Sequence, residues 1–211
     1  SDLPRVDLAY VTRIIDRSLM RLRAETLDLV QFHWWNYEVP GMVEAAQHLR
    51  RLQQAGKIRY IGGTNFDTPR TAAMLEAGVP IVSMQTQYSL LDRRPAGALS
   101  ALCAAQGVKL LCYGTVAGGF LSARWLGQKA PAEPLANRSL VKYRLIIEEF
   151  GGWDAFQALL RALDAIARKH GVSITAVATR WVLDQPHVAG AIVGARYAEH
   201  LPDNLRVFAF A

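Results

Sequence analysis

Polar and aromatic residues directly follow five short apolar segments of this chain, and their types suit carbonyl and amide chemistry. The five groups are His33-Trp34-Trp35, Thr64-Asn65, Gln85 with Gln87, Tyr113-Gly114, and Gly194-Ala195-Arg196. A histidine beside aromatic side chains can polarise a carbonyl or shuttle a proton, and paired amides such as Asn65 and Gln85 can hold a carboxamide. Tyr113 offers a flat surface for stacking. Ligands of α/β proteins bind at the carboxyl ends of the strands, so we expect these groups to share one site.

Each of these residues also has a purely structural interpretation. A histidine beside two tryptophans can be a hydrogen-bonded wall residue, and Asn65 can form an Asx turn. Tyr113 can belong to the core, and Gly114, Gly118 and Gly119 can serve tight turns only. The joint placement of the groups at strand ends is what favours a functional site.

Two apolar periods alternate along the chain, and this alternation predicts an α/β protein. Short β-branched runs predict strands at residues 27–32, 58–62, 81–85, 108–113 and 189–193. Spacings of three and four predict helices at residues 11–22, 42–52, 68–77, 96–106, 153–167 and 174–182. The pattern weakens between residues 120 and 138.

Strands that alternate with helices about every 25 to 30 residues indicate parallel βαβ units, in either a doubly wound sheet or a (β/α)8 barrel. A closed barrel needs eight strands and typically about 250 residues. We find five strands in 211 residues. Either the sheet is open or part of a barrel is absent.

The composition predicts a folded chain, with 51% hydrophobic and 20% charged residues and a mean hydropathy of +0.09. We expect residues 1–211 to form a single domain. No run of 18 apolar residues and no secretory signal is present, which favours a cytoplasmic protein without a membrane span. Cys103 and Cys112 lack disulfide or metal spacing, as do the five histidines, so we expect reduced cysteines and no metal.

The net charge of +6 comes with scattered basic residues. The basic pairs, such as Arg50-Arg51 and Arg93-Arg94, are short, which argues against nucleic-acid binding. A positive field favours a small anionic ligand, and a merely solvated surface is the alternative.

Six segments carry a resemblance to a known family. They are residues 27–34 (LDLVQFHW), 56–62 (GKIRYIG), 64–66 (TNF), 85–94 (QTQYSLLDRR), 113–119 (YGTVAGG) and 192–196 (IVGAR), with Glu199, Asp203 and Asn204 beyond. In order and separation they resemble the aldo/keto reductases over essentially the whole chain. The resemblance implies a TIM (β/α)8 barrel of which this chain holds about five of eight βα units, an incomplete barrel.

The resemblance also implies a role for each site residue. His33 matches the family's active-site histidine, which orients the substrate carbonyl. The residues that match the nicotinamide contacts are Thr64, Asn65 and Gln85 for the carboxamide and Tyr113 for ring stacking. The residues along the cofactor pyrophosphate are Gly114, Thr115, Val116, Gly118, Leu121 and Arg124, with Arg138 closing over it. The visible residues of the substrate wall are Trp34, Trp35, Tyr37 and Tyr88.

The adenosine end of the cofactor matches Gly194, Arg196, His200, Asp203 and Asn204. Arg196 is the natural partner of a 2′-phosphate and favours NADPH over NADH. His200 stands where the family more often has glutamine or arginine. Pro202 interrupts the expected helix, which weakens the adenine assignment.

The family's catalytic aspartate, tyrosine and lysine have no match in this sequence. The chain begins with serine, so we expect an upstream segment that was removed or not included. Hydride transfer also needs an acid that protonates the developing alkoxide, and His33 alone is a poor substitute. We therefore expect this chain to bind NADPH with little or no turnover.

The function implied by the resemblance is NADPH-dependent reduction of aldehyde or ketone carbonyls to alcohols. A small-molecule carbonyl compound is then the partner, without nucleic acid or membrane. One alternative is a non-catalytic NADPH sensor or auxiliary subunit, since the family resembles cofactor-binding subunits of ion channels. Another is a truncated product that does not fold stably.

Overall fold

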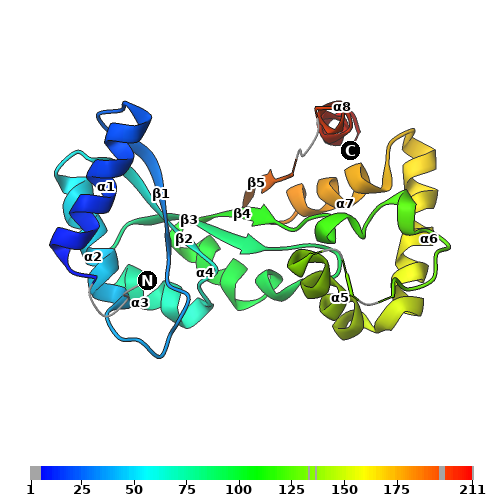
Figure 1. Cartoon of the computed structure of the whole chain (residues 1–211), viewed down its shortest axis with the longest axis horizontal. Helices are drawn as coiled ribbons and strands as arrows, with labels where there is room; N and C mark the ends of the chain where they lie inside the picture. Colours follow the sequence, from blue (N-terminus) through cyan, green and yellow to red (C-terminus); the bar gives the residue numbers. More distant parts are fainter. Residues whose placement is uncertain (1–5, 133, 136, 195–197, 211) are drawn as a thin grey trace. The chain divides into compact units, whose positions relative to one another are not determined.

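The computed structural model describes residues 6–132, 134–135, 137–194 and 198–210 (Figure 1). Five strands form one sheet in the order β1-β2-β3-β4-β5. Their bounds are β1 Leu27–His33, β2 Ile58–Thr64, β3 Ile81–Gln87, β4 Lys109–Tyr113 and β5 Val188–Ile192. The first three strands pair in parallel. All five predicted strands are present in the structure.

Helices alternate with the strands as far as β4, and three consecutive α-helices of the described chain separate β4 from β5. Their bounds are α1 Leu8–Leu22, α2 Met42–Gln54, α3 Thr68–Glu76, α4 Ala98–Gln106, α5 Arg138–Phe150, α6 Gly152–His170, α7 Ile174–Leu183 and α8 His200–Leu205. Short 3₁₀ turns are η2 Arg94–Ala96, η3 Ala117–Gly119, η4 Ala123–Trp125 and η5 Arg206–Phe208. The α/β prediction is confirmed, whereas α5 was not predicted.

The chain divides into two compact units. The amino-terminal unit comprises residues 1–86 and 98–110, and the carboxy-terminal unit comprises residues 87–97 and 111–211. The expectation of a single domain over residues 1–211 stays a prediction.

In the amino-terminal unit, side-chain caps fix where two helices begin. Asp7 accepts a hydrogen bond from the Tyr10 amide at the start of α1, at 2.7 Å. Asp67 accepts one from the Arg70 amide at the start of α3, at 3.0 Å. Pro69 follows in the first turn, where its missing N–H would have no helical partner. These caps satisfy donors that a helix cannot satisfy itself and so set the helix boundaries.

A glycine in the middle strand of this unit lets the two neighbouring strands touch across it. Gly62 pairs in register with Gln31 of β1 and with Ser83 of β3. Gln31 donates a hydrogen bond from Nε2 to Ser83 Oγ at 3.1 Å. A Cβ atom on Gly62 would lie 2.4 Å from Ser83 Oγ and 2.5 Å from Gln31 Oε1. The bond across three strands therefore depends on the absence of a side chain at residue 62.

In the carboxy-terminal unit, helices α5, α6 and α7 build the core. Buried members of this core are Leu91, Ala117, Phe120, Leu121, Tyr143, Ile146, Ile147, Phe156, Leu160, Leu163, Ala167, Ile174, Val177 and Ala178. As predicted, Ser173 caps α7 by accepting a hydrogen bond from the Ala176 amide at 3.0 Å. Asn137 caps α5 in the same way through the Leu140 amide, also at 3.0 Å.

Both cysteines are buried and unpaired. Burial raises the pKa of the Cys103 thiol to about 11 and that of the Cys112 thiol to about 12. Thiols with such pKa values stay protonated near neutral pH, so both behave as small apolar packing groups.

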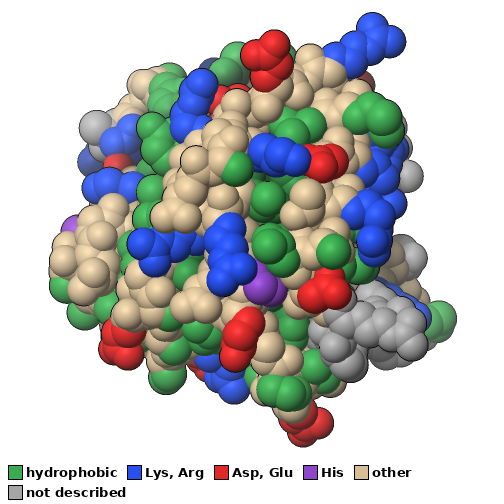
Figure 2. All heavy atoms as spheres, turned by 90° about the vertical axis from the view of Figure 1, so that its left-hand side faces the viewer, with side chains coloured by type: hydrophobic (Ala, Val, Ile, Leu, Met, Phe, Trp, Pro, Cys, Tyr) green, Lys and Arg blue, Asp and Glu red, His purple; other side chains and the backbone are tan. Residues whose placement is uncertain are grey.

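The face of the molecule drawn in Figure 2 shows lysine and arginine side chains interspersed with acidic and apolar ones. The amino-terminal unit carries an exposed ion pair between Arg59 and Asp28, at 2.8 Å. Within the described ranges, no helix has the length and apolar character that crossing a bilayer requires. The described part of the chain also holds no group of three or more His, Cys, Asp or Glu residues suited to a metal ion.

We expect Gly62→Ala to destabilise the protein by about 1–3 kcal/mol, because the new methyl group overpacks the Gln31–Ser83 contact. Urea denaturation measures this change. The matched control is Gly190→Ala, another strand glycine, where an added Cβ meets only Leu111 Cδ2 at 3.9 Å. Equal effects of the two substitutions would contradict the assignment of Gly62.

Candidate functional site

At the carboxyl end of the amino-terminal unit's strands, three predicted site residues lie side by side. His33 pairs in register with Thr64, and Thr64 pairs with Gln85. Partners in a parallel register point to the same face of a sheet, so the three side chains form a row. The next residue, Asn65, donates a backbone hydrogen bond to the Gln85 carbonyl at 2.8 Å. The structure therefore brings His33, Thr64, Asn65 and Gln85 together, as the sequence predicts.

Asn65 adopts the left-handed backbone conformation, with φ at +59°. Asparagine tolerates this region better than most residues other than glycine. The conformation ends the strand and turns the chain toward α3. The turn interpretation and the binding interpretation of Asn65 are thus compatible.

Two predicted substrate-wall residues follow His33 in opposite settings. Trp35 is exposed, and its ring contacts the His33 imidazole edge-on with centroids 6.3 Å apart. Trp34 is buried and donates a hydrogen bond from Nε1 to the Val39 carbonyl at 3.1 Å. His33, Trp34 and Trp35 line a cavity of about 390 Å³ whose other walls are mainly apolar side chains of α1, β1 and α2. An aromatic cavity beside a histidine suits a small carbonyl compound.

A second cavity, of about 540 Å³, lies in the carboxy-terminal unit. We name it the loop cavity. It is lined by the loop after β4, the first turns of α5 and α7, the end of β5, and α8 with the preceding Glu199. The predicted cofactor residues that line it are Gly114, Thr115, Val116, Gly118, Gly194, His200, Asp203 and Asn204. Residues assigned separately to the pyrophosphate and to the adenosine end thus surround one cavity.

The glycines of this loop are required by a close contact with α5. Gly114 and Gly118 have positive φ angles of +72° and +64°. A Cβ atom on Gly114 would lie 2.5 Å from the Tyr143 hydroxyl, and one on Gly118 would lie 2.7 Å from the Tyr143 ring. Burial raises the pKa of Tyr143 to about 12, so its phenol stays neutral. The loop is held against α5 by an uncharged aromatic contact.

At the other side of the loop cavity, α8 forms in spite of Pro202. The proline lies in the first turn of the helix, where no helical hydrogen bond is lost. Asp203 accepts a hydrogen bond from Ser173 Oγ at 2.9 Å. The Asn204 Nδ2 donor is buried and has no hydrogen-bond partner in the described part of the chain. Since a buried donor without a partner is costly, this amide fits a role in holding a ligand with acceptor atoms.

Other predicted cofactor residues lie outside the wall of the loop cavity. Leu121 is fully buried in the core. Arg124 and Arg138 are exposed, and the Arg124 guanidinium lies 5.4 Å from the Trp125 ring centroid. Tyr113 is half-buried, with Lys142 Nζ 5.3 Å from its ring centroid. Arg196 lies outside the described residues.

Seven residues that line the loop cavity were not among the predicted contacts. They are Gly119, Ser139, Tyr143, Thr175, Ile192, Val193 and Glu199. Ser139 and Tyr143 belong to the unpredicted helix α5, whose apolar residues Leu140, Tyr143, Ile146 and Ile147 do follow a helical spacing. That spacing was the available signal.

Tyr88, a predicted wall residue, lines neither cavity. Its side chain is buried, its hydroxyl donates to Gln185 Oε1 at 3.4 Å, and its ring packs edge-on against Trp181. This packing gives Tyr88 a structural role in the carboxy-terminal unit.

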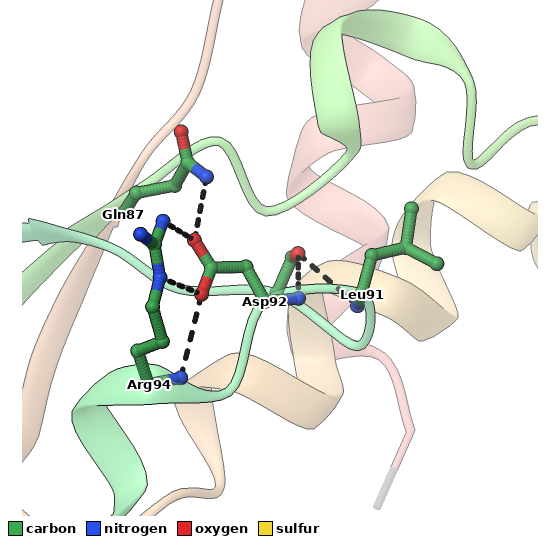
Figure 3. A network of polar contacts seen from close by, with 5 residues as sticks. Gln87, Leu91, Asp92 and Arg94 are labelled. Atoms are coloured by element: carbon green, nitrogen blue, oxygen red, sulfur yellow. Dashed lines mark hydrogen bonds and ion pairs between the residues drawn. The ribbon is translucent and has the colours of Figure 1, made fainter. Parts of the chain in front are cut away.

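A buried carboxylate fixes the chain that leaves β3, as Figure 3 shows. Asp92 accepts hydrogen bonds from Gln87 Nε2 at 2.6 Å and from the Arg94 guanidinium at 2.6 and 2.8 Å. Burial by itself raises the pKa of Asp92, but the hydrogen bonds from Arg94 and Gln87 outweigh it and hold the pKa below its usual value. Gln87 is thereby fixed beside Gly114, where a Cβ would lie 3.2 Å from Gln87 Cγ.

Comparison with known proteins identifies the family. The model of the aldo/keto reductase family matches residues 4–211, and the chain belongs to this family. Its fold is therefore that of the (β/α)8 barrel enzymes, of which the described residues hold five strands in an incomplete barrel.

Three relatives show the extent of the similarity. The structure of glycerol dehydrogenase AKR11B4 from Gluconobacter oxydans matches with a TM-score of 0.81 at 28% identity, over 98% of this chain and 61% of that one. Protein tas of Escherichia coli K12 is 30% identical over 95% of this chain and 62% of its own length. Flagellar radial spoke protein 5 of Chlamydomonas reinhardtii is 34% identical over 76% of this chain and 34% of its own length. The chain thus spans between a third and three fifths of these relatives.

We expect Asp92→Asn to destabilise the protein by about 2–3 kcal/mol at pH 7, because the charge-assisted bonds to Arg94 and Gln87 are lost. The folded-state pKa of Asp92 is lowered, so its contribution is present above the unfolded pKa near 3.8 and disappears as the pH falls through the folded value. The difference between wild type and variant should therefore shrink below about pH 4.

Denaturation in urea at several pH values measures this difference. Asp28→Asn, which removes the exposed ion pair with Arg59, is the control and should change stability by less than about 1 kcal/mol. A wild-type advantage over Asp92→Asn that stays constant down to pH 2 would be inconsistent with the role given to the carboxylate.

Proposed function

We propose that this chain carries the NADPH-binding machinery of an oxidoreductase that reduces aldehyde or ketone carbonyls to alcohols. The loop cavity carries the proposal, because cofactor residues predicted from two distant segments line its wall. Membership of the aldo/keto reductase family and the similarity to a glycerol dehydrogenase support it.

The loop cavity suits the phosphate and adenosine parts of the cofactor. Backbone amides of the glycine loop after β4 can donate to phosphate oxygens, as glycine-rich turns do in other nucleotide sites. The buried Asn204 amide supplies a further donor. Arg196 would supply the positive charge for a 2′-phosphate, which is the basis for preferring NADPH.

The row in the amino-terminal unit suits the reactive end. Thr64, Asn65 and Gln85 would hold the carboxamide, and the family resemblance gives Tyr113 the role of stacking on the nicotinamide ring. NADPH supplies the hydride when bound. His33 would donate a hydrogen bond from its imidazole to the substrate carbonyl, orienting it and favouring the developing charge on oxygen.

Proton delivery is the step for which this sequence offers no matched residue. The family's aspartate, tyrosine and lysine have no counterpart in the chain, and the imidazole of His33 alone is a weak proton source for an alkoxide. We propose that the 211-residue chain binds NADPH with little or no turnover. The reductase activity itself would then require the aspartate, tyrosine and lysine that the family places on its first three strands.

A second candidate function is a non-catalytic NADPH sensor or auxiliary subunit. The similarity to flagellar radial spoke protein 5 of Chlamydomonas reinhardtii favours it, because that name, unlike those of the reductases, describes no reaction. A sensor binds NADPH without consuming it. The enzyme interpretation predicts that turnover appears once an upstream segment carrying the three missing residues is joined to the chain.

We expect isothermal titration calorimetry to show that the chain binds NADPH at least about tenfold more tightly than NADH. Arg196→Ala should remove this preference by weakening NADPH only, since NADH has no 2′-phosphate. Arg59→Ala, which removes an exposed arginine of β2, is the control and should leave both affinities unchanged. No binding of either nucleotide would refute the proposal, and equal affinities would refute the preference for NADPH.

A parallel assay separates the two candidate functions. NADPH oxidation is followed at 340 nm with aldehydes and ketones, first for the chain and then for the chain joined to an upstream aldo/keto reductase segment. The proposal predicts oxidation only by the joined protein, with loss of the rate in His33→Ala. Steady oxidation by the chain alone would overturn its proposed inactivity, and no oxidation by either would favour the sensor.

A further inference from the structure

The loop that follows β1 sends one aromatic side chain to the proposed carboxamide site. Tyr37 donates a hydrogen bond from its hydroxyl to the backbone carbonyl of Asn65, at 2.9 Å. The Asn65 amide on the other side of the same residue donates to Gln85, at 2.8 Å. Asn65, with its positive φ, is therefore held through both of its backbone polar groups. Gln85 of the sheet holds its amide, and Tyr37 of the loop holds its carbonyl.

Two hydrogen bonds within the loop brace the segment that carries Tyr37. Trp34 Nε1 donates to the Val39 carbonyl at 3.1 Å, and the Glu38 amide donates to Asn36 Oδ1, also at 3.1 Å. Each bond joins a residue before Tyr37 to a residue after it. The tyrosine is thus presented to Asn65 by a short loop that its own hydrogen bonds hold in shape.

The ring of Tyr37 is fixed as well. The Arg70 guanidinium carbon lies 3.7 Å from the ring centroid, a close cation–π contact. Arg70 is held in place by an ion pair with Asp67, the residue that caps α3. Phe66 packs against the ring with centroids 6.2 Å apart. The start of α3 therefore orients the tyrosine whose hydroxyl reaches Asn65.

Tyr37 remains a donor over the whole neutral range. Burial and the Asp67 charge raise the pKa of Tyr37, and this outweighs the lowering by Arg70. The phenol therefore keeps its proton, and the bond to Asn65 is present wherever the protein is folded at neutral pH.

We propose that Tyr37 is a positioning residue that sets the conformation of Asn65 for the nicotinamide carboxamide. The inference rests on the proposed function, in which Asn65 touches the carboxamide. The left-handed region is small for an asparagine, so its backbone must be held there by neighbouring contacts if the side chain is to keep one orientation toward a ligand. A bond that fixes its carbonyl also fixes the direction in which its side chain leaves the backbone, which preorganises the contact.

This role differs from the substrate wall expected for Tyr37 from the sequence. The hydroxyl is engaged by the Asn65 backbone, and one ring face is covered by Arg70. The residue serves the cofactor side of the site through Asn65 and needs no contact with substrate.

The test uses Tyr37→Phe, which removes only the hydroxyl. We expect NADPH affinity measured by calorimetry to fall about 5- to 10-fold, while 2′,5′-ADP, which lacks the nicotinamide, binds as before. In an Asn65→Gly background, which keeps the positive φ without the carboxamide contact, Tyr37→Phe should have no further effect. Tyr60→Phe, at a half-exposed tyrosine of β2, is the control and should change nothing.

Nuclear magnetic resonance of the nucleotide-free chain gives a second readout, in which Tyr37→Phe should shift or broaden the Asn65 amide signal. Unchanged NADPH affinity in Tyr37→Phe, with wild type binding normally, would overturn the inference and leave the proposed function intact. An equal loss for NADPH and 2′,5′-ADP would also overturn it, because the effect would then be general. A wild-type chain that does not bind NADPH refutes the proposed function and the role of Tyr37 together.

Discussion

The parallel register of β1, β2 and β3 is the constraint on which the amino-terminal site depends. It places His33, Thr64 and Gln85 in one row, and a shift of a single residue would turn each side chain to the opposite face. Gly62 helps to fix this register two residues before Thr64, since only a residue without a side chain leaves room for the Gln31–Ser83 bond. Backbone pairing of the three strands thus sets the alignment of the site residues. Asn65 and Tyr37 follow at the carboxyl end of these strands.

In the carboxy-terminal unit, packing and not strand pairing fixes the position of the candidate site residues. Its glycine loop has little regular structure of its own, and its shape follows from the contact with Tyr143 of α5 and from Gln87, which Asp92 holds in place. Positive φ angles at Gly114 and Gly118 allow the backbone to approach the aromatic ring. The wall of the loop cavity is therefore formed by backbone on one side and by α8 on the other.

Sequence patterns predicted the five strands and most of the helices and missed α5. The five strands and helices such as α7, with its Ser173 cap, follow directly from apolar runs and capping residues. Helix α5 was missed because it directly follows the segment of weak pattern between residues 120 and 138, although its apolar residues Leu140, Tyr143, Ile146 and Ile147 follow a helical spacing. Because α5 was not predicted, its residues Ser139 and Tyr143, which line the loop cavity, were not predicted as site residues.

Site residues at strand ends were predictable because the chain order of the strands fixes where those ends meet. The contact partners of individual side chains could not be predicted in this way. Nothing in the sequence indicates that Tyr37 reaches Asn65, because the bond depends on how the loop from residue 34 to residue 39 folds and on the Arg70 contact. The same holds for Tyr88, whose burial against Trp181 depends on packing in the carboxy-terminal unit.

We propose that the loop cavity binds the phosphate and adenosine parts of NADPH. Titration of the isotope-labelled chain with NADPH, followed by its amide resonances, is the decisive experiment. We expect saturable shifts at residues 114–119 and in α8, including the side-chain amide of Asn204, with much smaller shifts in α6. Saturation by NADPH that leaves the glycine loop and α8 unmoved, or the absence of any saturable shift, would contradict it.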